Sequence, residues 1–245
     1  MNDLRGLFAP VVSPFTDEGV NISEVRLARL MRHLAGLDIA GFVVNTTAGE
    51  FTTTSFGERK EILEIAIREA QGKPVIAHCS TLSTLATLDL AQHAARHGAR
   101  AALVMPPYYG DFDDLELQKH FEPLALFGNL PTIIIDPLNR LSDAVVDALS
   151  VHQSLHFGSP IPDVHGEHFE YSTDCFSLEG LICLPVGTLR QHGELAELQH
   201  FLNQHGSERV LKAGLLQQDV EVGTPRAPRR PLRDEFLREL NHLLS

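Results

Sequence analysis

Several features that define other classes of protein are missing from this sequence. No stretch approaches the roughly 18 apolar residues of a membrane span, and the first residues, MNDLR, do not begin the apolar segment of a signal peptide. The three cysteines, Cys79, Cys175 and Cys183, are widely spaced and form no CxxC pair. They argue against a disulfide framework and a structural zinc site. We therefore expect a cytoplasmic protein with buried thiols.

Positive charge is also scarce. The chain has 20 Lys and Arg residues against 32 Asp and Glu, which gives a formal net charge of -12. Nucleic-acid binding requires a cationic surface, so a nucleic-acid partner is not expected. What is present is an ordinary globular composition, with 43% hydrophobic residues in a chain of 245. That length suits a single α/β barrel of about 250 residues.

Up to about residue 150, short apolar runs alternate with longer segments of helical period, which is typical of repeated βα units and a parallel sheet. The apolar runs predict strands at residues 6–12, 41–44, 74–78, 101–105 and 131–135. The segments between them predict helices at residues 23–37, 57–71, 84–97 and 114–127. Ser55 and Glu58 have the spacing of a capping box for the second helix, and Gly98 is placed to end the third.

The regular alternation ends near residue 150. Further strands are predicted at residues 154–157, 169–172 and 180–184, and helices at residues 193–203 and 233–244. The stretch 159–168 is shorter than the dozen or more residues of a normal parallel crossover, so a full sixth helix does not fit there. A Pro- and Arg-rich connector leads into the last helix. We predict a barrel over residues 1–222 and a connector with a C-terminal helix packed on it over residues 223–245.

Two groups of residues in the first quarter of the chain match a known pattern. Residues 6–15, GLFAPVVSPF, match a first strand that ends in a T-P-F turn, with Ser13 in place of threonine. Residues 45–51, NTTAGEF, match a G-T-T-G-E motif, and Glu58-Arg59 match the E-R pair of the helix that follows.

Later segments continue the match in the same order. PPYY at residues 106–109 matches a P-x-Y-Y turn, VLKA at 210–213 matches V-K-x-x-L, and RAPRRPL at 226–232 matches R-x-P-L. One such motif would be weak, but the ordered set is specific. Over most of its length the chain resembles the dihydrodipicolinate synthase and N-acetylneuraminate lyase family.

That resemblance implies a (β/α)₈ TIM barrel with its site at the C-terminal ends of the strands. In the family a lysine at the end of the sixth strand forms an imine with a 2-oxo acid, usually pyruvate, as an electron sink for making or breaking a carbon–carbon bond. Hydroxyl residues after the second strand, tyrosines, and an arginine after the fifth strand complete the site. A tyrosine from a neighbouring subunit also takes part, so a homodimer or higher homo-oligomer is expected.

Only part of this set is present here. Thr47 keeps the first hydroxyl after the second strand, but alanine replaces the second. Tyr109 matches the tyrosine that reaches a neighbouring subunit, and Arg140 matches the arginine after the fifth strand. The Tyr-Asn pair that ends the fifth strand is Ile135-Asp136, so the phenol that would donate a proton is lost.

The catalytic lysine has no counterpart at the sixth strand, where the segment LHFGSP places Ser159 near the lysine position. The chain has four lysines, which the pattern assigns to outer helices, to the loop before the third strand and to the V-K-x-x-L helix: Lys60, Lys73, Lys119 and Lys212. Without an imine, proton removal next to a 2-oxo acid has no covalent electron sink. We expect Schiff-base catalysis to be lost.

Thirteen histidines suggest a different chemistry. His78 ends the third strand, and His165 and His168 follow the sixth; with Asp136 they could hold a divalent metal that polarises a substrate oxygen. That would make a metal-dependent lyase. Scattered histidines are more often surface or supporting groups, so the favoured prediction is no metal and no cofactor.

The other candidates also have plain alternatives. Asp136 is a new general base or a solvated turn residue before Pro137. Arg140 is a clamp for a substrate carboxylate or a surface ion pair. Tyr109 contacts a partner's cavity or packs in an interface. Thr47 holds substrate or caps local backbone.

The favoured hypothesis is a dihydrodipicolinate synthase-like protein that has become a small-carboxylate-binding, regulatory or assembly subunit. Its candidate site residues are Thr47, Tyr109 and Asp136 for any remaining chemistry, and Thr47, Arg140 and His78 for binding a small carboxylate or 2-oxo acid. The alternative is an active lyase or aldolase on a 2-oxo or hydroxy acid without an imine. The arginines of residues 226–233 are expected to solvate the final helix or to pair with acidic neighbours rather than to bind phosphate.

Overall fold

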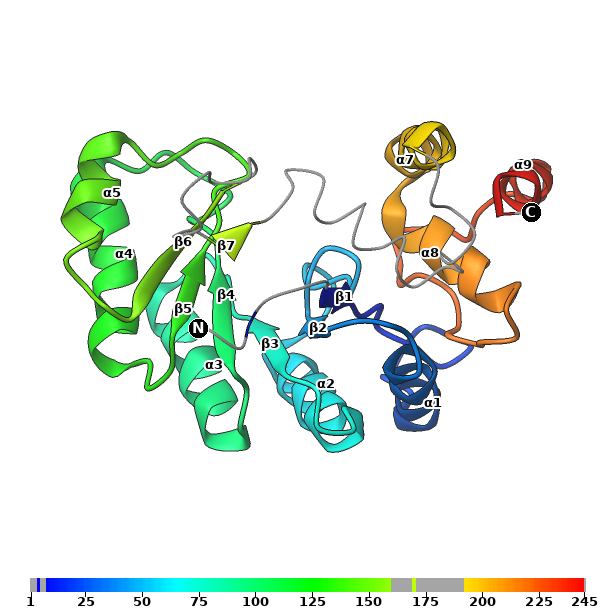
Figure 1. The fold of residues 1–245 in the computed structure, drawn as a ribbon, viewed down its shortest axis with the longest axis horizontal. Helices are drawn as coiled ribbons and strands as arrows, with labels where there is room; N and C mark the ends of the chain where they lie inside the picture. The colour runs from blue at the N-terminus through cyan, green and yellow to red at the C-terminus, as the bar shows by residue number, and fades with distance from the viewer. Residues whose placement is uncertain (1–3, 5–7, 160–168, 171–191, 245) are drawn as a thin grey trace. The chain divides into compact units, whose positions relative to one another are not determined.

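The computed structural model describes residue 4 and residues 8–159, 169–170 and 192–244 (Figure 1). The chain divides into two compact units. Apart from Met1, unit 1 is the continuous segment Val75–Thr173, whereas unit 2 combines Asn2–Pro74 with Asp174–Ser245. Unit 2 therefore joins segments from both ends of the sequence.

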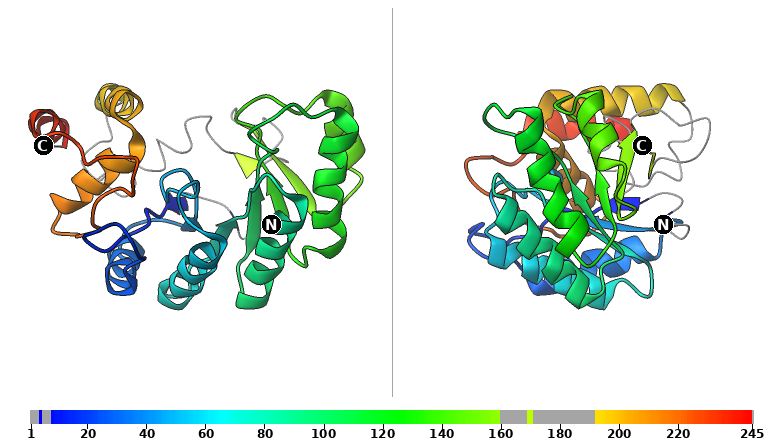
Figure 2. Two further views of the ribbon diagram at one scale, coloured as in Figure 1. Left: turned by 180° about the vertical axis from the view of Figure 1, so that it is seen from behind. Right: turned by 90° about the vertical axis from the view of Figure 1, so that its left-hand side faces the viewer.

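Unit 1 is built around a parallel sheet with its strands in chain order. The strands are β3 (Val75–His78), β4 (Ala101–Val104), β5 (Thr132–Ile134), β6 (Leu155–Ser159) and β7 (Phe169–Glu170). The helices between them are α3 (Thr84–His97), α4 (Asp114–Phe127) and α5 (Asp143–Leu149). Figures 1 and 2 show these helices along one side of the sheet. Because the strands are parallel, their C-terminal ends lie at the same edge.

Local sequence explains the elements of unit 1. Strands β3, β4 and β5 are buried along their whole length, which is typical of parallel strands covered on both faces. The side chain of Ser83 accepts the Ala86 amide at the start of α3, and Gly98 ends that helix at a φ of 92°. That left-handed conformation favours glycine, as the sequence indicated.

The connection after β6 is unusually short. Gly158 pairs with Phe169 and Ser159 with Glu170, in parallel, so the chain crosses from β6 to β7 within residues 160–168. A parallel crossover normally needs a dozen or more residues. The shortening expected around the sixth crossover is therefore seen in the pairing of the strands; residues 160–168 themselves lie outside the described part.

Unit 2 contains a parallel strand pair and helices from both ends of the chain. The strands are β1 (Phe8–Pro10) and β2 (Gly41–Val44). The helices are α1 (Glu24–Ala35), α2 (Phe56–Glu69), α7 (His192–His205), α8 (Ser207–Leu216) and α9 (Asp234–Leu244). Helix α1 packs on α2, and the three C-terminal helices contact one another pairwise.

Close packing fixes the start of β2. A Cβ atom at Gly41 would lie 2.5 Å from a carbon of the Phe8 ring and 2.5 Å from the Pro74 carbonyl oxygen, so only glycine fits. Ser55 and Glu58 form the capping box expected at the start of α2. These local features confirm the element boundaries at this point to within about two residues.

Most elements agree with the sequence-based prediction. Helices α3 and α4 have the predicted bounds, and β2 does too. Helix α5 was not predicted, and α8 was recognised only through its V-K-x-x-L motif. The strand predicted at residues 180–184 lies outside the described residues, and the division at residue 222 stays a prediction. Within the described part of the chain, no helix has the length and apolar character needed to cross a bilayer.

Candidate functional site

In unit 1, hydrogen bonds also join the residues that directly follow the C-terminal ends of β3, β4 and β5. The Cys79 amide donates to the Leu103 carbonyl at 2.8 Å, and the Ile135 amide donates to the Val104 carbonyl at 3.0 Å. The hydroxyl of Ser80 accepts the Met105 amide at 2.8 Å. This edge of the sheet is therefore in fixed register, so side chains that follow the strands have defined positions.

His78 and Cys79 lie at this edge and are both 1% exposed. Sequence analysis assigned His78 to the binding of a substrate at the barrel mouth. Because His78 is buried at the end of β3, it could contact a substrate only if the substrate entered below the protein surface. His165 and His168, the other histidines considered as metal ligands, lie outside the described residues.

Arg140 braces the turn that carries Tyr109. Its guanidinium donates to the carbonyl of Gly110 at 2.7 Å and to that of Tyr108 at 3.3 Å. Guanidinium carries five N–H donors, so these two contacts leave others for a carboxylate. Tyr109 is 79% exposed. The structure therefore brings the predicted Arg140 and Tyr109 together in one loop system.

Asp136 holds the loop that leads to Arg140. Its Oδ2 accepts the Leu141 amide at 2.7 Å, and its side chain is half-buried. This contact supports its interpretation as a turn residue, because one carboxylate oxygen is engaged with backbone. It also fixes the path of the chain between Asp136 and Arg140.

Thr47 belongs to unit 2, in the loop after β2. Its carbonyl accepts the Glu50 amide at 2.9 Å, and the Ser13 hydroxyl donates to the Gly49 carbonyl at 2.5 Å. Thr47 is half-buried, whereas Ala48 is fully buried and offers no hydroxyl. The loop is thus rigid, but it presents only one of the two hydroxyl groups sought.

The same loop carries a buried ion pair. The ammonium of Lys212, on α8, lies 2.7 Å from Oε1 of Glu50, and the two side chains are 2% and 0% exposed. Lys212 also donates to the Thr224 carbonyl at 3.0 Å and lies 4.3 Å above the Phe15 ring. Burial lowers the pKa of Lys212 to about 8, against the opposing effect of the Glu50 charge.

Arg226 completes this cluster from the connector before α9. Its backbone amide donates to Oε2 of Glu50 at 2.9 Å, and its guanidinium makes a two-pronged contact with Glu58 at 2.7 and 3.0 Å. Burial raises the pKa of Glu58, but hydrogen bonds from Arg226 and Ser55 outweigh it and leave the pKa below its ordinary value. We call Glu50, Glu58, Lys212 and Arg226 the buried charge cluster.

A family model described as "Dihydrodipicolinate synthetase family" matches residues 3–147 of this chain. The chain belongs to the dihydrodipicolinate synthetase family. Among curated relatives, 4-hydroxy-tetrahydrodipicolinate synthase of Methanothrix thermoacetophila is 34% identical over 136 residues, which are 56% of this chain and 45% of that protein. The enzyme of the same name from Mycolicibacterium paratuberculosis is 26% identical over 279 residues, covering 97% of this chain and 93% of that one. The match to the Methanothrix enzyme therefore spans less than half of that protein.

Solved structures of low sequence identity share this fold. The catalytic lysine mutant of Ruminococcus gnavus sialic acid aldolase has a TM-score of 0.79 at 19% identity, covering 100% of this chain and 96% of that one. Dihydrodipicolinate synthase of Bacillus anthracis has a TM-score of 0.77 at 20% identity, covering 98% and 97%. The expected TIM-barrel fold is confirmed, in a form shortened at the sixth crossover.

All four lysines can be placed. Strand β6 contains none and ends at Ser159. Lys60 and Lys119 lie on α2 and α4, and the ammonium of Lys73 donates to the Ile39 carbonyl at 2.7 Å. Lys212 is the amine in the buried charge cluster. The V-K-x-x-L motif correctly places Lys212 on a helix, but its pairing with Glu50 was not predicted, although both residues belong to family motifs.

Proposed function

We propose that this family member no longer performs Schiff-base catalysis and acts as a small-carboxylate-binding, regulatory or assembly subunit. The observation that supports this most is the placement of the four lysines. None is on β6, and the one with a lowered pKa is 3% exposed and paired with Glu50. An imine requires a neutral amine that substrate can reach.

Binding of a small carboxylate or 2-oxo acid is the retained part of the proposal. Arg140 is fixed by backbone contacts that leave N–H donors for a ligand, and fixed donors lose less conformational freedom on binding. His78, Tyr109 and Asp136 are proposed as the other groups of this site in unit 1, and the Thr47 hydroxyl is proposed as a separate candidate group in unit 2. A lone arginine with a few hydrogen bonds corresponds to millimolar affinity, about -4 kcal/mol.

Assembly through unit 1 is the second part. Tyr109 is 79% exposed, and Leu85 on α3 and Leu115 on α4 are 78% and 56% exposed. Exposed tyrosine and leucine are suited to a subunit interface. Light scattering coupled to size-exclusion chromatography at micromolar concentration should give a mass at least twice 27.0 kDa. A monomer at that concentration would contradict this part.

The loss of imine chemistry is tested by borohydride reduction with pyruvate, followed by intact mass measurement. We expect no stoichiometric adduct. Wild-type Ruminococcus gnavus sialic acid aldolase and its catalytic lysine mutant serve as positive and negative controls. A reduced adduct mapped to any of Lys60, Lys73, Lys119 or Lys212 would overturn the proposal. Turnover of a 2-oxo or hydroxy acid without an adduct would instead favour a lyase without an imine.

A further inference from the structure

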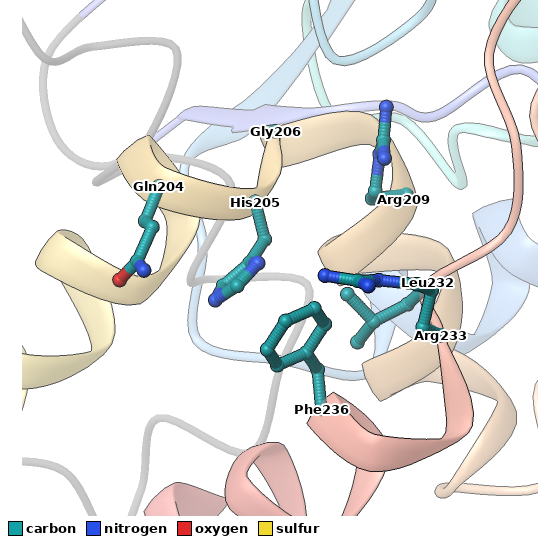
Figure 3. Close-up of a pocket in the computed structure, with 7 residues that line it drawn as sticks. All are labelled: Gln204, His205, Gly206, Arg209, Leu232, Arg233 and Phe236. Atoms are coloured by element: carbon teal, nitrogen blue, oxygen red, sulfur yellow. The ribbon is translucent and has the colours of Figure 1, made fainter.

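A pocket lies in unit 2 where α7 ends, α8 begins and α9 begins (Figure 3). Its volume is about 340 Å³. The described residues that line it are Gln204, His205, Gly206, Arg209, Leu232, Arg233 and Phe236. None of the residues proposed for the carboxylate site at Arg140 is among them, so the pocket is not explained by the proposed function.

The lining carries positive charge. Arg209 and Arg233 contribute guanidinium groups, and none of the described lining residues is acidic. Arg233 pairs with Glu235 at 2.8 Å, but both side chains are well exposed, at 71% and 61%. An exposed pair of this kind is weak, so Arg233 stays available to a competing anion.

A buried donor lacks an acceptor at this pocket. Nε of Arg209 is shielded from solvent and has no hydrogen-bond partner among the described residues. It lies 3.5 Å from where a Cβ on Gly206 would stand, and Oε2 of Glu208 lies 3.7 Å from the same point. Burying an N–H group without an acceptor is unfavourable, and an anionic ligand oxygen would supply one.

Two further features suit an anion with a flat or apolar body. The N-cap of α8 is Gly206, which makes no side-chain cap, and the carboxylate in the first turn, Glu208, is paired with Arg229 at 2.8 Å. The Phe236 ring lies 4.0 Å from the His205 ring and 4.4 Å from the Arg233 guanidinium carbon. Figure 3 shows Phe236 and Leu232 side by side beneath His205 and Arg233. These contacts hold the cation in place next to an apolar surface.

We propose that this pocket binds a small organic anion, held by Arg233 through its carboxylate or phosphate group, with its apolar part against Phe236; the Arg209 guanidinium extends away from Phe236 and adds positive charge to the rim (Figure 3). This pocket has two arginines and an aromatic ring, whereas the proposed carboxylate site has the single arginine Arg140. The pocket therefore prefers aryl anions to pyruvate. Both sites can be tested in the same full-length chain, because variants of Arg233 and of Arg140 should each affect only one of them.

Calorimetry on the full chain with benzoate, phenyl phosphate, inorganic phosphate and pyruvate tests the proposal. We expect benzoate or phenyl phosphate to bind more tightly than inorganic phosphate, and Arg233→Gln to weaken that ligand at least tenfold. Arg209→Gln should weaken it less, because the Arg209 guanidinium extends away from Phe236. Glu235→Gln should tighten it, because Arg233 loses its competing partner. Arg238→Gln, on the exposed face of α9, and Arg140→Ala should leave it unchanged.

The outcomes separate the two sites. Absence of binding by all of the aryl anions and phosphate overturns this proposal without affecting that at Arg140. Binding that is insensitive to Arg209→Gln and Arg233→Gln but lost in Arg140→Ala also overturns it. Arg233 is 71% exposed, so its variant should fold as the parent does, and equal thermal melting without ligand verifies this.

Discussion

Family motifs occur both in the buried charge cluster of unit 2 and at the strand ends of unit 1. The two regions differ in whether these residues stabilise the fold or face a possible ligand. In unit 2, Glu50, Lys212 and Arg226 are held by ion pairs and backbone hydrogen bonds inside the unit. In unit 1, β6 contains no lysine, and β5 is followed by Ile135 and Asp136. The charged residues of unit 2 are packed inside that unit, and the loss of the family's reacting groups in unit 1 is our proposal.

This difference distinguishes residues that indicate common ancestry from residues that indicate a shared reaction. A buried carboxylate left without its partner costs several kcal/mol, so losing Lys212 alone would destabilise the fold whether or not the chain catalyses a reaction. Residues that face a substrate carry no such penalty and can change freely once the reaction is not needed. A family match that includes residues of the first kind therefore supports the fold strongly and the reaction weakly.

The largest expected effect comes from breaking the buried pair. Lys212→Met leaves Glu50 buried without its cation and should lower the free energy of unfolding by about 3–5 kcal/mol. Urea denaturation followed by circular dichroism measures this. Lys119→Met, on the exposed face of α4, should change it by less than about 0.5 kcal/mol. Equal, small effects of the two variants would show that the cluster does not stabilise the fold.

Acid should affect unit 1 through His120. Burial lowers its pKa to about 4, and its Nδ1 lies 3.0 Å from the Thr84 hydroxyl. Because the folded-state pKa is below the unfolded value of 6.5, the folded protein binds fewer protons between pH 6.5 and 4, so stability falls as pH falls through that window. The loss should be on the order of 3 kcal/mol at pH 4.

The measurement is the urea midpoint as a function of pH. His120→Gln should flatten the slope between pH 6.5 and 4, whereas His242→Gln, on an exposed position of α9, should leave it unchanged. An unchanged slope in His120→Gln would assign the acid sensitivity to other groups.

Arg226→Ala should destabilise unit 2 by about 2–3 kcal/mol, since hydrogen bonds to charged groups are worth about 1.5–3 kcal/mol each before relaxation. It removes the contact with Glu58 and the donation to the Thr53 carbonyl at 2.9 Å. The exposed neighbour Arg230→Ala is the matched control. If both variants melt at the same temperature as the parent, the contribution of Arg226 to the cluster is negligible.

The smallest effect is expected at the strand ends. Arg140→Ala should weaken small-carboxylate binding about tenfold, equivalent to about 1.4 kcal/mol, and change stability by less than 1 kcal/mol. Calorimetry with pyruvate and small dicarboxylates measures the first, and thermal melting the second. Undiminished affinity in Arg140→Ala would place the carboxylate elsewhere.

Local patterns were sufficient for most of the fold. Strand β2 and helices α3 and α4 follow from apolar period and capping residues close in sequence, such as Ser83 and Gly98, because these interactions are local. Helix α5 was missed because it has seven residues, too few to show a clear period. The sixth crossover was predicted to be short from length alone, which is a geometric limit on parallel strands.

The sequence by itself determined the family, the parallel α/β fold and the absence of a lysine on β6, because motif order, apolar period and residue identity are properties of the chain. Only the tertiary structure decided that Lys212 faces Glu50 across 162 positions of sequence, that Arg226 closes on both Glu50 and Glu58, and that Arg140 braces the Tyr109 turn. Such pairings depend on which distant segments pack together, and they stabilise the fold only once burial removes water from the charges.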